Sequence, residues 1–108
     1  MNHLKGEITL FSKWRSSPMK EGYKPMFRIL GKGGSLCISE MEKEELLPGE
    51  STKGKIEFLN IEYVVSILKE EGREFQPGQY FFLREGPYVV GKFKVEEVLN
   101  LGNGRKNP

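Results

Sequence analysis

Apolar and polar residues alternate along much of the chain with a period of two. The segment after Pro87 illustrates this: one parity holds Val89, Gly91, Phe93 and Val95, and the other holds Val90, Lys92, Lys94 and Glu96. Such alternation is typical of a β-strand with one buried face. Further strands are predicted at residues 5–12, 24–30, 36–39, 53–59 and 79–83.

Residues 61–71 follow a different period. Their apolar side chains recur at the helical spacing i, i+3, i+4 and i+7, at Ile61, Val64, Val65 and Leu68. Asn60 stands at an N-cap position and Gly72 at a C-cap position, so this segment is predicted to be a short amphipathic helix, although its β-branched residues favour a strand. Its apolar side is expected to close one end of the β structure; the alternative is that it fills a groove on a partner.

Glycine and proline separate the predicted strands. Turns are expected at 47–50, at 76–78 and at Gly86-Pro87. The glycine-rich segment 31–34 lacks the G-x-x-x-x-G-K-[ST] spacing and the following helix of a phosphate-binding loop, so it is predicted to be a turn, and GTP is not expected to bind. Short strands joined by such turns favour an all-β fold, either a small closed barrel or a sandwich.

The size and composition of the chain favour one small domain. It has 108 residues, of which 37% are hydrophobic and 30% are charged. We expect a single domain over residues 1–100 and a flexible basic tail over 101–108. No apolar run approaches the roughly 18 residues of a membrane span, and the first residues lack the apolar segment of a secretory signal. A cytoplasmic location without membrane contact is therefore expected.

Residues that commonly carry catalysis or bind metals are scarce. Cys37 is the one cysteine and His3 the one histidine, which excludes an intrachain disulfide, most zinc sites and most Ser-His or Cys-His mechanisms. Cys37 is expected to pack as a small side chain in a strand. The glutamates show no pair with a distinctive spacing. The chain is therefore predicted not to be an enzyme, with no cofactor and no metal.

Charge is distributed unevenly along the chain. The formal net charge is +2, but residues 1–32 hold seven Lys or Arg against two Glu, whereas residues 40–50 hold five Glu against one Lys. Such asymmetry occurs both in anion-binding faces and in solvated surfaces without a partner. The charge distribution leaves both alternatives open.

Three motifs follow one another in an order found in a known protein family. Residues 22–27 (G-Y-K-P-M-F) resemble G-Y-R-P-Q-F, residues 48–50 (P-G-E) resemble P-G-D, and residues 82–86 (F-L-R-E-G) with Val90-Gly91 resemble A-I-R-E-G-G-R-T-V-G. This order, over roughly residues 5–99, resembles the C-terminal, third domain of elongation factor Tu. The resemblance implies a small closed antiparallel β-barrel, with the predicted helix as an insertion.

The resemblance also implies candidate site residues. In the family, an Arg before H-T-P and the Glu-Gly of R-E-G belong to the surface that binds the T-stem of aminoacyl-tRNA. The matching positions here, which form a candidate RNA-binding site, are Arg15, Glu85 and Gly86. The motifs further indicate a candidate partner surface made of Tyr23, Lys24, Pro25 and Arg84.

Several residues differ from the family's motifs, and these differences limit how much of the family's function can be expected of this chain. Met26 replaces the family's Gln, Ser16 replaces its His, and residues 31–34 supply no equivalent of its Thr. Half of the tRNA-binding surface is therefore missing. The GTPase domain and its Walker A motif are absent from these 108 residues, so nucleotide hydrolysis is not expected.

Two functions follow from these observations. The first is a noncatalytic, translation-related module that binds another protein, with a mimic or decoy of elongation factor Tu as a special case. The alternative is an RNA-binding protein that retains part of the T-stem-binding surface and binds tRNA or another structured RNA through Arg15, Glu85 and Gly86.

Overall fold

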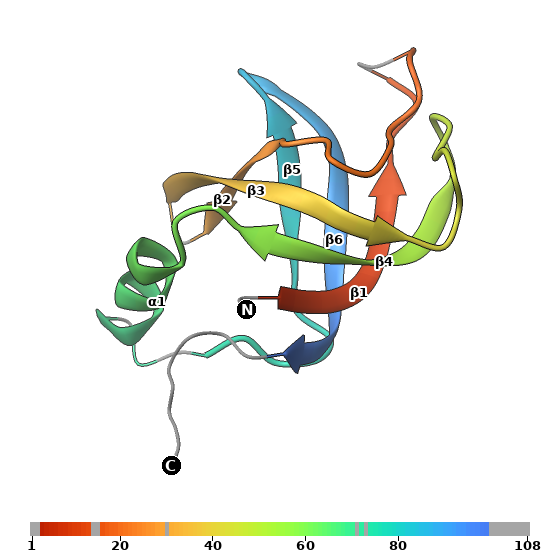
Figure 1. Cartoon of the computed structure of the whole chain (residues 1–108). Helices are drawn as coiled ribbons and strands as arrows, with labels where there is room; N and C mark the ends of the chain where they lie inside the picture. The colour runs from red at the N-terminus through yellow and green to blue at the C-terminus, as the bar shows by residue number, and fades with distance from the viewer. Residues whose placement is uncertain (1–2, 14–15, 30, 71, 73, 100–108) are drawn as a thin grey trace.

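In the part of the chain that the structure describes, six strands close into an antiparallel barrel. The computed structural model describes residues 3–13, 16–29, 31–70, 72 and 74–99; Leu30, Glu71 and the predicted tail at 101–108 lie outside this set. The elements are β1 (His3–Leu10), β2 (Met26–Ile29), β3 (Lys32–Met41), β4 (Ser51–Phe58), α1 (Ile61–Glu70), β5 (Tyr80–Glu85) and β6 (Tyr88–Leu99) (Figure 1). The strand order is β1-β4-β3-β2-β5-β6, and β6 pairs back with β1. The predicted all-β barrel with one short helix is confirmed.

The inward faces of the strands supply the core. On β1, Leu4, Ile8 and Leu10 are fully buried, as a period of two requires. A cluster of aromatic rings, whose neighbouring centroids lie 5.1–6.2 Å apart, fills the interior and consists of Phe27, Phe58, Phe75, Phe81 and Phe93. Burial of these apolar side chains is the main source of the barrel's stability.

A β-bulge changes the alternation of faces along β6. Leu83 on β5 pairs with Gly91, but the next residue, Arg84, pairs with Val89, so Val90 is an extra residue between the two pairs. Val90 is 1% exposed and belongs to the core. The sequence pattern placed Val90 on the same side of the strand as Lys92 and Lys94, which would make it face outward. This prediction is wrong, because the extra residue shifts the alternation at this point.

The glycine-rich segment forms less of a turn than predicted. Gly31, with a φ of 78°, makes the turn, but Lys32 already begins β3, and the two glycines after it pair with β2. A Cβ at Gly34 would lie 2.7 Å from the ring of Phe27. Glycine at this position lets that ring pack over the strand. β3 spans Lys32–Met41 and therefore extends beyond the predicted 36–39 at both ends.

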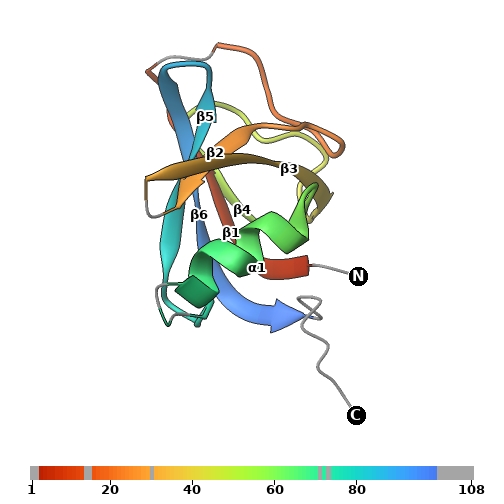
Figure 2. The same ribbon diagram turned by 90° about the vertical axis from the view of Figure 1, so that its left-hand side faces the viewer.

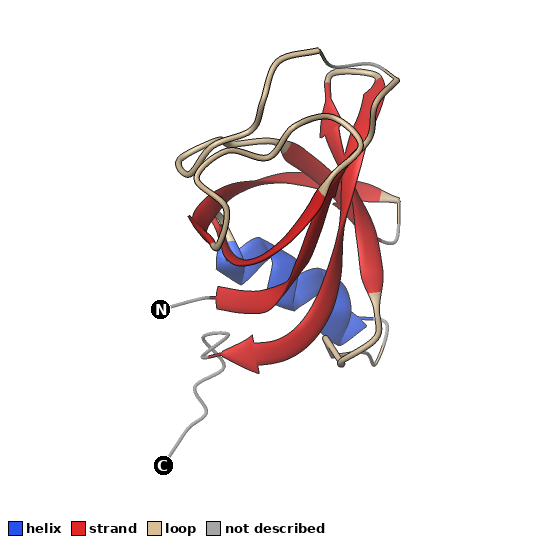
Figure 3. Ribbon diagram, turned by 90° about the vertical axis from the view of Figure 1, so that its right-hand side faces the viewer, coloured by secondary structure: helices blue, strands red, loops and turns tan. Residues whose placement is uncertain are grey.

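The helix α1 lies at the end of the barrel opposite the long loops that join β1 to β2 and β3 to β4 (Figures 1 and 3). Figure 2 shows it in front of the lower part of the barrel. Val64 and Leu68 are buried and join the core, so the apolar side of the helix covers this end of the β structure, as predicted. Within the described part of the chain, no helix is long and apolar enough to cross a membrane.

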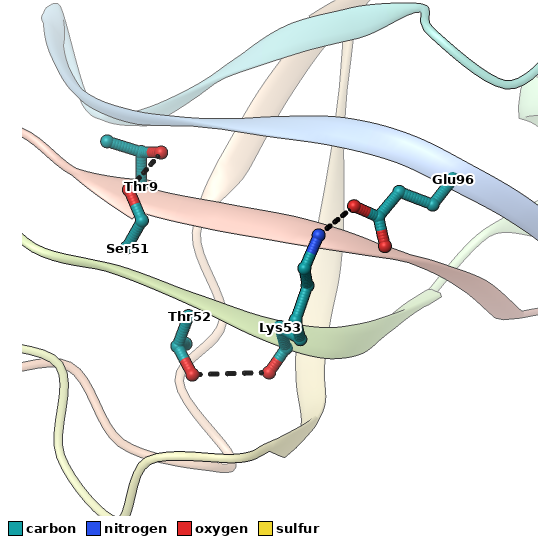
Figure 4. A network of polar contacts seen from close by, with 5 residues as sticks. All are labelled: Thr9, Ser51, Thr52, Lys53 and Glu96. Carbon is teal, nitrogen blue, oxygen red and sulfur yellow. Dashed lines mark hydrogen bonds and ion pairs between the residues drawn. The ribbon is translucent and has the colours of Figure 1, made fainter.

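Polar contacts link the outward faces of β1, β4 and β6 (Figure 4). Thr9 Oγ1 on β1 and Ser51 Oγ on β4 share a hydrogen bond of 2.8 Å. Lys53 on β4 reaches across β1, and its ammonium donates to the carboxylate of Glu96 on β6. This hydrogen bond raises the pKa of Lys53 above its ordinary value of 10.5. Because these side chains are exposed, the contacts add little stability but fix the side chains on this face.

Glu50, in the turn before β4, is expected to make stability depend on pH in the acidic range. Its carboxylate accepts a hydrogen bond from the Leu47 amide (3.0 Å) and lies 3.3 Å from the Lys43 ammonium, and these contacts lower the pKa of Glu50 below its ordinary value of 4.5. A lowered pKa in the folded state contributes stability that is present above the ordinary pKa and is lost as the pH falls through the folded-state value.

The variant Glu50→Gln tests this contribution. In urea unfolding followed by circular dichroism, the stability difference between the wild type and Glu50→Gln should be largest near neutral pH and should shrink as the pH falls below the ordinary value of 4.5. Glu44→Gln, an exposed change in the same loop, serves as the control. A difference that stays constant over this pH range would contradict the assignment.

Candidate functional site

The two motif segments 22–27 and 82–86 lie side by side. Met26 pairs with Arg84, and Phe27 pairs with Leu83, where β2 meets β5. The barrel therefore brings together two segments that are far apart in the sequence. We call the side chains gathered here the tip surface, which consists of Tyr23, Lys24, Met26, Arg84 and Glu85.

A hydrogen bond joins the two motifs. The hydroxyl of Tyr23 donates to Oε2 of Glu85, 62 positions away, and both residues are half-buried. The backbone holds Tyr23 in place: its amide donates to the carbonyl of Lys20 (3.1 Å), and its carbonyl accepts from the amide of Ile38 on β3 (2.8 Å). The Glu85 carboxylate is thereby held by a partner within the barrel.

Arg84 and Gly86 shape the turn between β5 and β6. Gly86 has a φ of 58°, which glycine adopts without strain. Across the turn, Nη2 of Arg84 donates to the carbonyl of Pro87 at 3.3 Å. The guanidinium is thus held near the tip, and the backbone of Arg84 pairs with that of Met26 on the neighbouring strand.

The remaining predicted site residues differ in their exposure. Lys24 is exposed, whereas Pro25 is buried, and its carbonyl accepts a hydrogen bond from the Leu36 amide at 3.1 Å. Pro25 therefore supports the packing of β2 against β3 and does not present its side chain at the surface. Arg15 lies outside the described residues.

A second cluster of exposed side chains was not predicted from the sequence. On β5, Tyr80 is 59% exposed and Phe82 is 42% exposed, and their rings meet at 82° with centroids 5.6 Å apart. Phe11, just after β1, meets Phe82 at 6.5 Å, and Lys92 Nζ lies 5.7 Å from the Tyr80 ring centroid. We call these four residues the aromatic face. Residues 80–83 are apolar on both parities, so alternation could not show which rings point outward.

A shallow depression of about 570 Å³ lies between the end of α1 and the turn before β5. It is lined by Lys69, Gly72, Glu74, Gln76 and Gln79. The side-chain amide of Gln79 accepts from the Gln76 amide (2.9 Å) and donates to the Glu74 carbonyl (3.3 Å), so its role is to hold the turn. Over the described ranges, no group of three or more His, Cys, Asp or Glu side chains is arranged to hold a metal ion.

Tyr23→Phe is expected to lower the free energy of unfolding by about 1 kcal/mol, because the half-buried Glu85 carboxylate loses a hydrogen-bond donor. Urea unfolding followed by circular dichroism measures this loss. Tyr63→Phe, on α1, removes a hydroxyl from a side chain that is 40% exposed, and it should change the stability by less than about 0.5 kcal/mol. Equal effects of the two changes would show that the bond to Glu85 contributes nothing.

No protein-family model matches the chain. No curated protein matches it at a significant level. The function is therefore argued from the geometry of the tip surface and from the motifs that form it.

Proposed function

We propose that this chain is a noncatalytic protein-binding module that holds its partner through the tip surface. The observation that carries the proposal is Met26, which is 46% exposed and is the register partner of Arg84 where β2 meets β5. A single exposed methionine is common on protein surfaces. Here it lies opposite an arginine on the neighbouring strand, and methionine and arginine are both among the residue types enriched in protein interfaces.

The hydrogen bonds of the tip surface favour binding without rearrangement. Glu85 is bonded to Tyr23, and Arg84 is bonded to the carbonyl of Pro87. Side chains that are ordered before binding lose less conformational entropy when a partner arrives. The tip surface therefore offers an apolar centre with a charged rim whose geometry is largely set in advance.

The resemblance to elongation factor Tu suggests what kind of protein the partner is. The tip surface is built from the residues that resemble the G-Y-R-P-Q-F and R-E-G motifs of that family. A mimic or decoy would use these residues to compete for proteins that bind elongation factor Tu. A cytoplasmic, translation-related role is part of this proposal.

Binding of the tRNA T-stem has less support. Glu85, which would contact the RNA, is bonded to Tyr23, and Met26 stands where the family has a polar side chain. A buried RNA contact at Met26 would leave polar groups of the RNA without partners. We therefore retain RNA binding at Arg15, Glu85 and Gly86 as the second candidate.

Photo-crosslinking tests the protein-binding proposal. With a photoreactive residue at Lys24, an extract of the native host treated with nuclease should yield a discrete crosslinked protein, and unlabelled wild-type chain should compete for it. Met26→Asp should reduce the yield by about tenfold, as expected for loss of a central apolar contact. The same photoreactive residue at Lys43, exposed in another loop, is the control. A product that disappears with nuclease treatment would support RNA binding instead.

A further inference from the structure

The aromatic face lies in an outward row of side chains on β5. Alternate residues of a strand point to the same side at intervals of about 6.7 Å, which places Tyr80, Phe82 and Arg84 in one row, opposite the buried Phe81 and Leu83. Both rings are exposed although the core lies directly beneath the same strand. They are therefore available to a flat ligand group on the solvent side.

Basic side chains border this row on both sides. On β6, Lys94 is the register partner of Tyr80, and Lys92 is the register partner of Phe82. On the other neighbour, β2, Arg28 is exposed and lies two residues beyond Met26, the partner of Arg84. The rings consequently lie between cations that a polyanion could contact.

Two carboxylates on β1 and β6 lie beside cations of their own. Glu7 on β1 is the register partner of Lys94. Glu96, further along β6, accepts a hydrogen bond from Lys53. The face around Tyr80 and Phe82 therefore keeps a positive character through Lys92, Arg84 and Arg28.

We propose that the aromatic face and its basic border bind a single-stranded nucleic acid. Its bases would stack on Tyr80 and Phe82, and its phosphates would contact Lys92 and Arg28. Stacking of bases on exposed aromatic side chains of a sheet, beside a basic groove, is a general way of holding single strands. Because every base has a π-face, the binding is tolerant of sequence. This inference does not depend on the proposed function of the tip surface.

The composition of the face favours a nucleic acid over a protein partner. Lysine is depleted in protein interfaces, yet both register partners of the exposed rings are lysines, Lys92 and Lys94. The tip surface, in contrast, has the exposed Met26 at its centre. A single strand is favoured over a duplex because the bases of a duplex are stacked on one another and cannot reach the rings.

Fluorescence anisotropy with a labelled oligodeoxythymidylate of about 12 nucleotides tests the inference at low salt. Tyr80→Ala and Phe82→Ala should each weaken binding about tenfold, the effect of losing one stacked base. Phe82→Tyr should bind like the wild type. Lys92→Ala should weaken binding and reduce the slope of log affinity against log salt by about 0.7, as expected for one lost phosphate contact.

Matched controls lie on other parts of the barrel. Tyr63→Ala, on α1, removes a ring that is 40% exposed, and Lys43→Ala, in the loop between β3 and β4, removes an exposed cation. Neither change should alter the affinity for the oligonucleotide. Circular dichroism of each variant checks that the barrel is folded, and because Tyr80 and Phe82 are exposed, their alanine variants are expected to fold.

Four results would overturn the inference. The first is an absence of wild-type binding at low salt. The second is equal affinity for a duplex of the same length. The third is that the alanine variants of Tyr80 and Phe82 bind as tightly as the wild type. The fourth is a protein crosslinked to a photoreactive group at Phe82 in a nuclease-treated extract and displaced by unlabelled chain, which would assign this face to a protein partner.

Discussion

Phe81→Ala is expected to lower the free energy of unfolding by about 4 kcal/mol, measured by urea unfolding followed by circular dichroism. Phe81 is 7% exposed, and its ring centroid lies 5.7–6.2 Å from those of Phe27, Phe58, Phe75 and Phe93. Removing the ring leaves a cavity bordered by side chains from other elements of the barrel. Because those elements are held by the hydrogen bonds of the sheet, the cavity collapses little, and the lost contacts are not replaced.

The adjacent residue provides the control for Phe81→Ala. Phe82 is the same residue type on the same strand, but it is 42% exposed and points outward. Phe82→Ala should change the stability by less than about 1 kcal/mol, because a surface change leaves no buried cavity. Similar losses for the two variants would mean that the inward and outward faces of β5 are assigned incorrectly.

Gly6→Ala is expected to lower the free energy of unfolding by about 3 kcal/mol. Gly6 lies on β1 where its register with β6 shifts. A Cβ at this position would overlap with the backbone carbonyl oxygen of Lys94 and would lie 2.9 Å from the ring of Phe93. The carbonyl belongs to a hydrogen-bonded strand, so the overlap can be relieved only by moving β1 and β6 apart. Urea unfolding with circular dichroism measures the cost.

Gly33→Ala is the matched control for Gly6→Ala. It also adds one methyl group to a strand glycine, but its Cβ would lie 3.5 Å from the nearest atom, the carbonyl oxygen of Phe27, which is an ordinary contact. The stability should change by less than about 1 kcal/mol, because glycine to alanine without strain also restricts the unfolded chain. A large loss at Gly33 would mean that general β-strand effects, not the close approach of β6, determine the result at Gly6.

Elements with a single regular period were predictable from the sequence. On β4, Ile56 and Phe58 are buried and Glu57 between them is not, and on α1 the helical spacing placed Val64 and Leu68 in the core. In both cases one face of the element meets the interior. The period of the sequence then indicates the buried side.

Local departures from regular structure were not predictable. The bulge at Val90 depends on how β5 and β6 align. The adjacent Gly91 is of a type common at bulges, but it does not indicate which residue is the extra one. The outward direction of Tyr80 and Phe82 depends on the register of a strand that is apolar on both parities. The motifs identified Tyr23 and Glu85 separately, but their hydrogen bond depends on the alignment of β2 with β5, 62 positions apart.

During synthesis on the ribosome, the barrel stays open until its last strand has emerged. β1 pairs with both β4 and β6, and its pairing with β6 joins His3 to Leu99. A nascent chain that lacks β6 has two open edges, one on β1 and one on β5, whose unpaired amide and carbonyl groups are templates for pairing with other chains. Completion of β6 covers both edges at once. The time spent between β5 and the end of β6 is therefore the interval in which the nascent chain is most prone to aggregate.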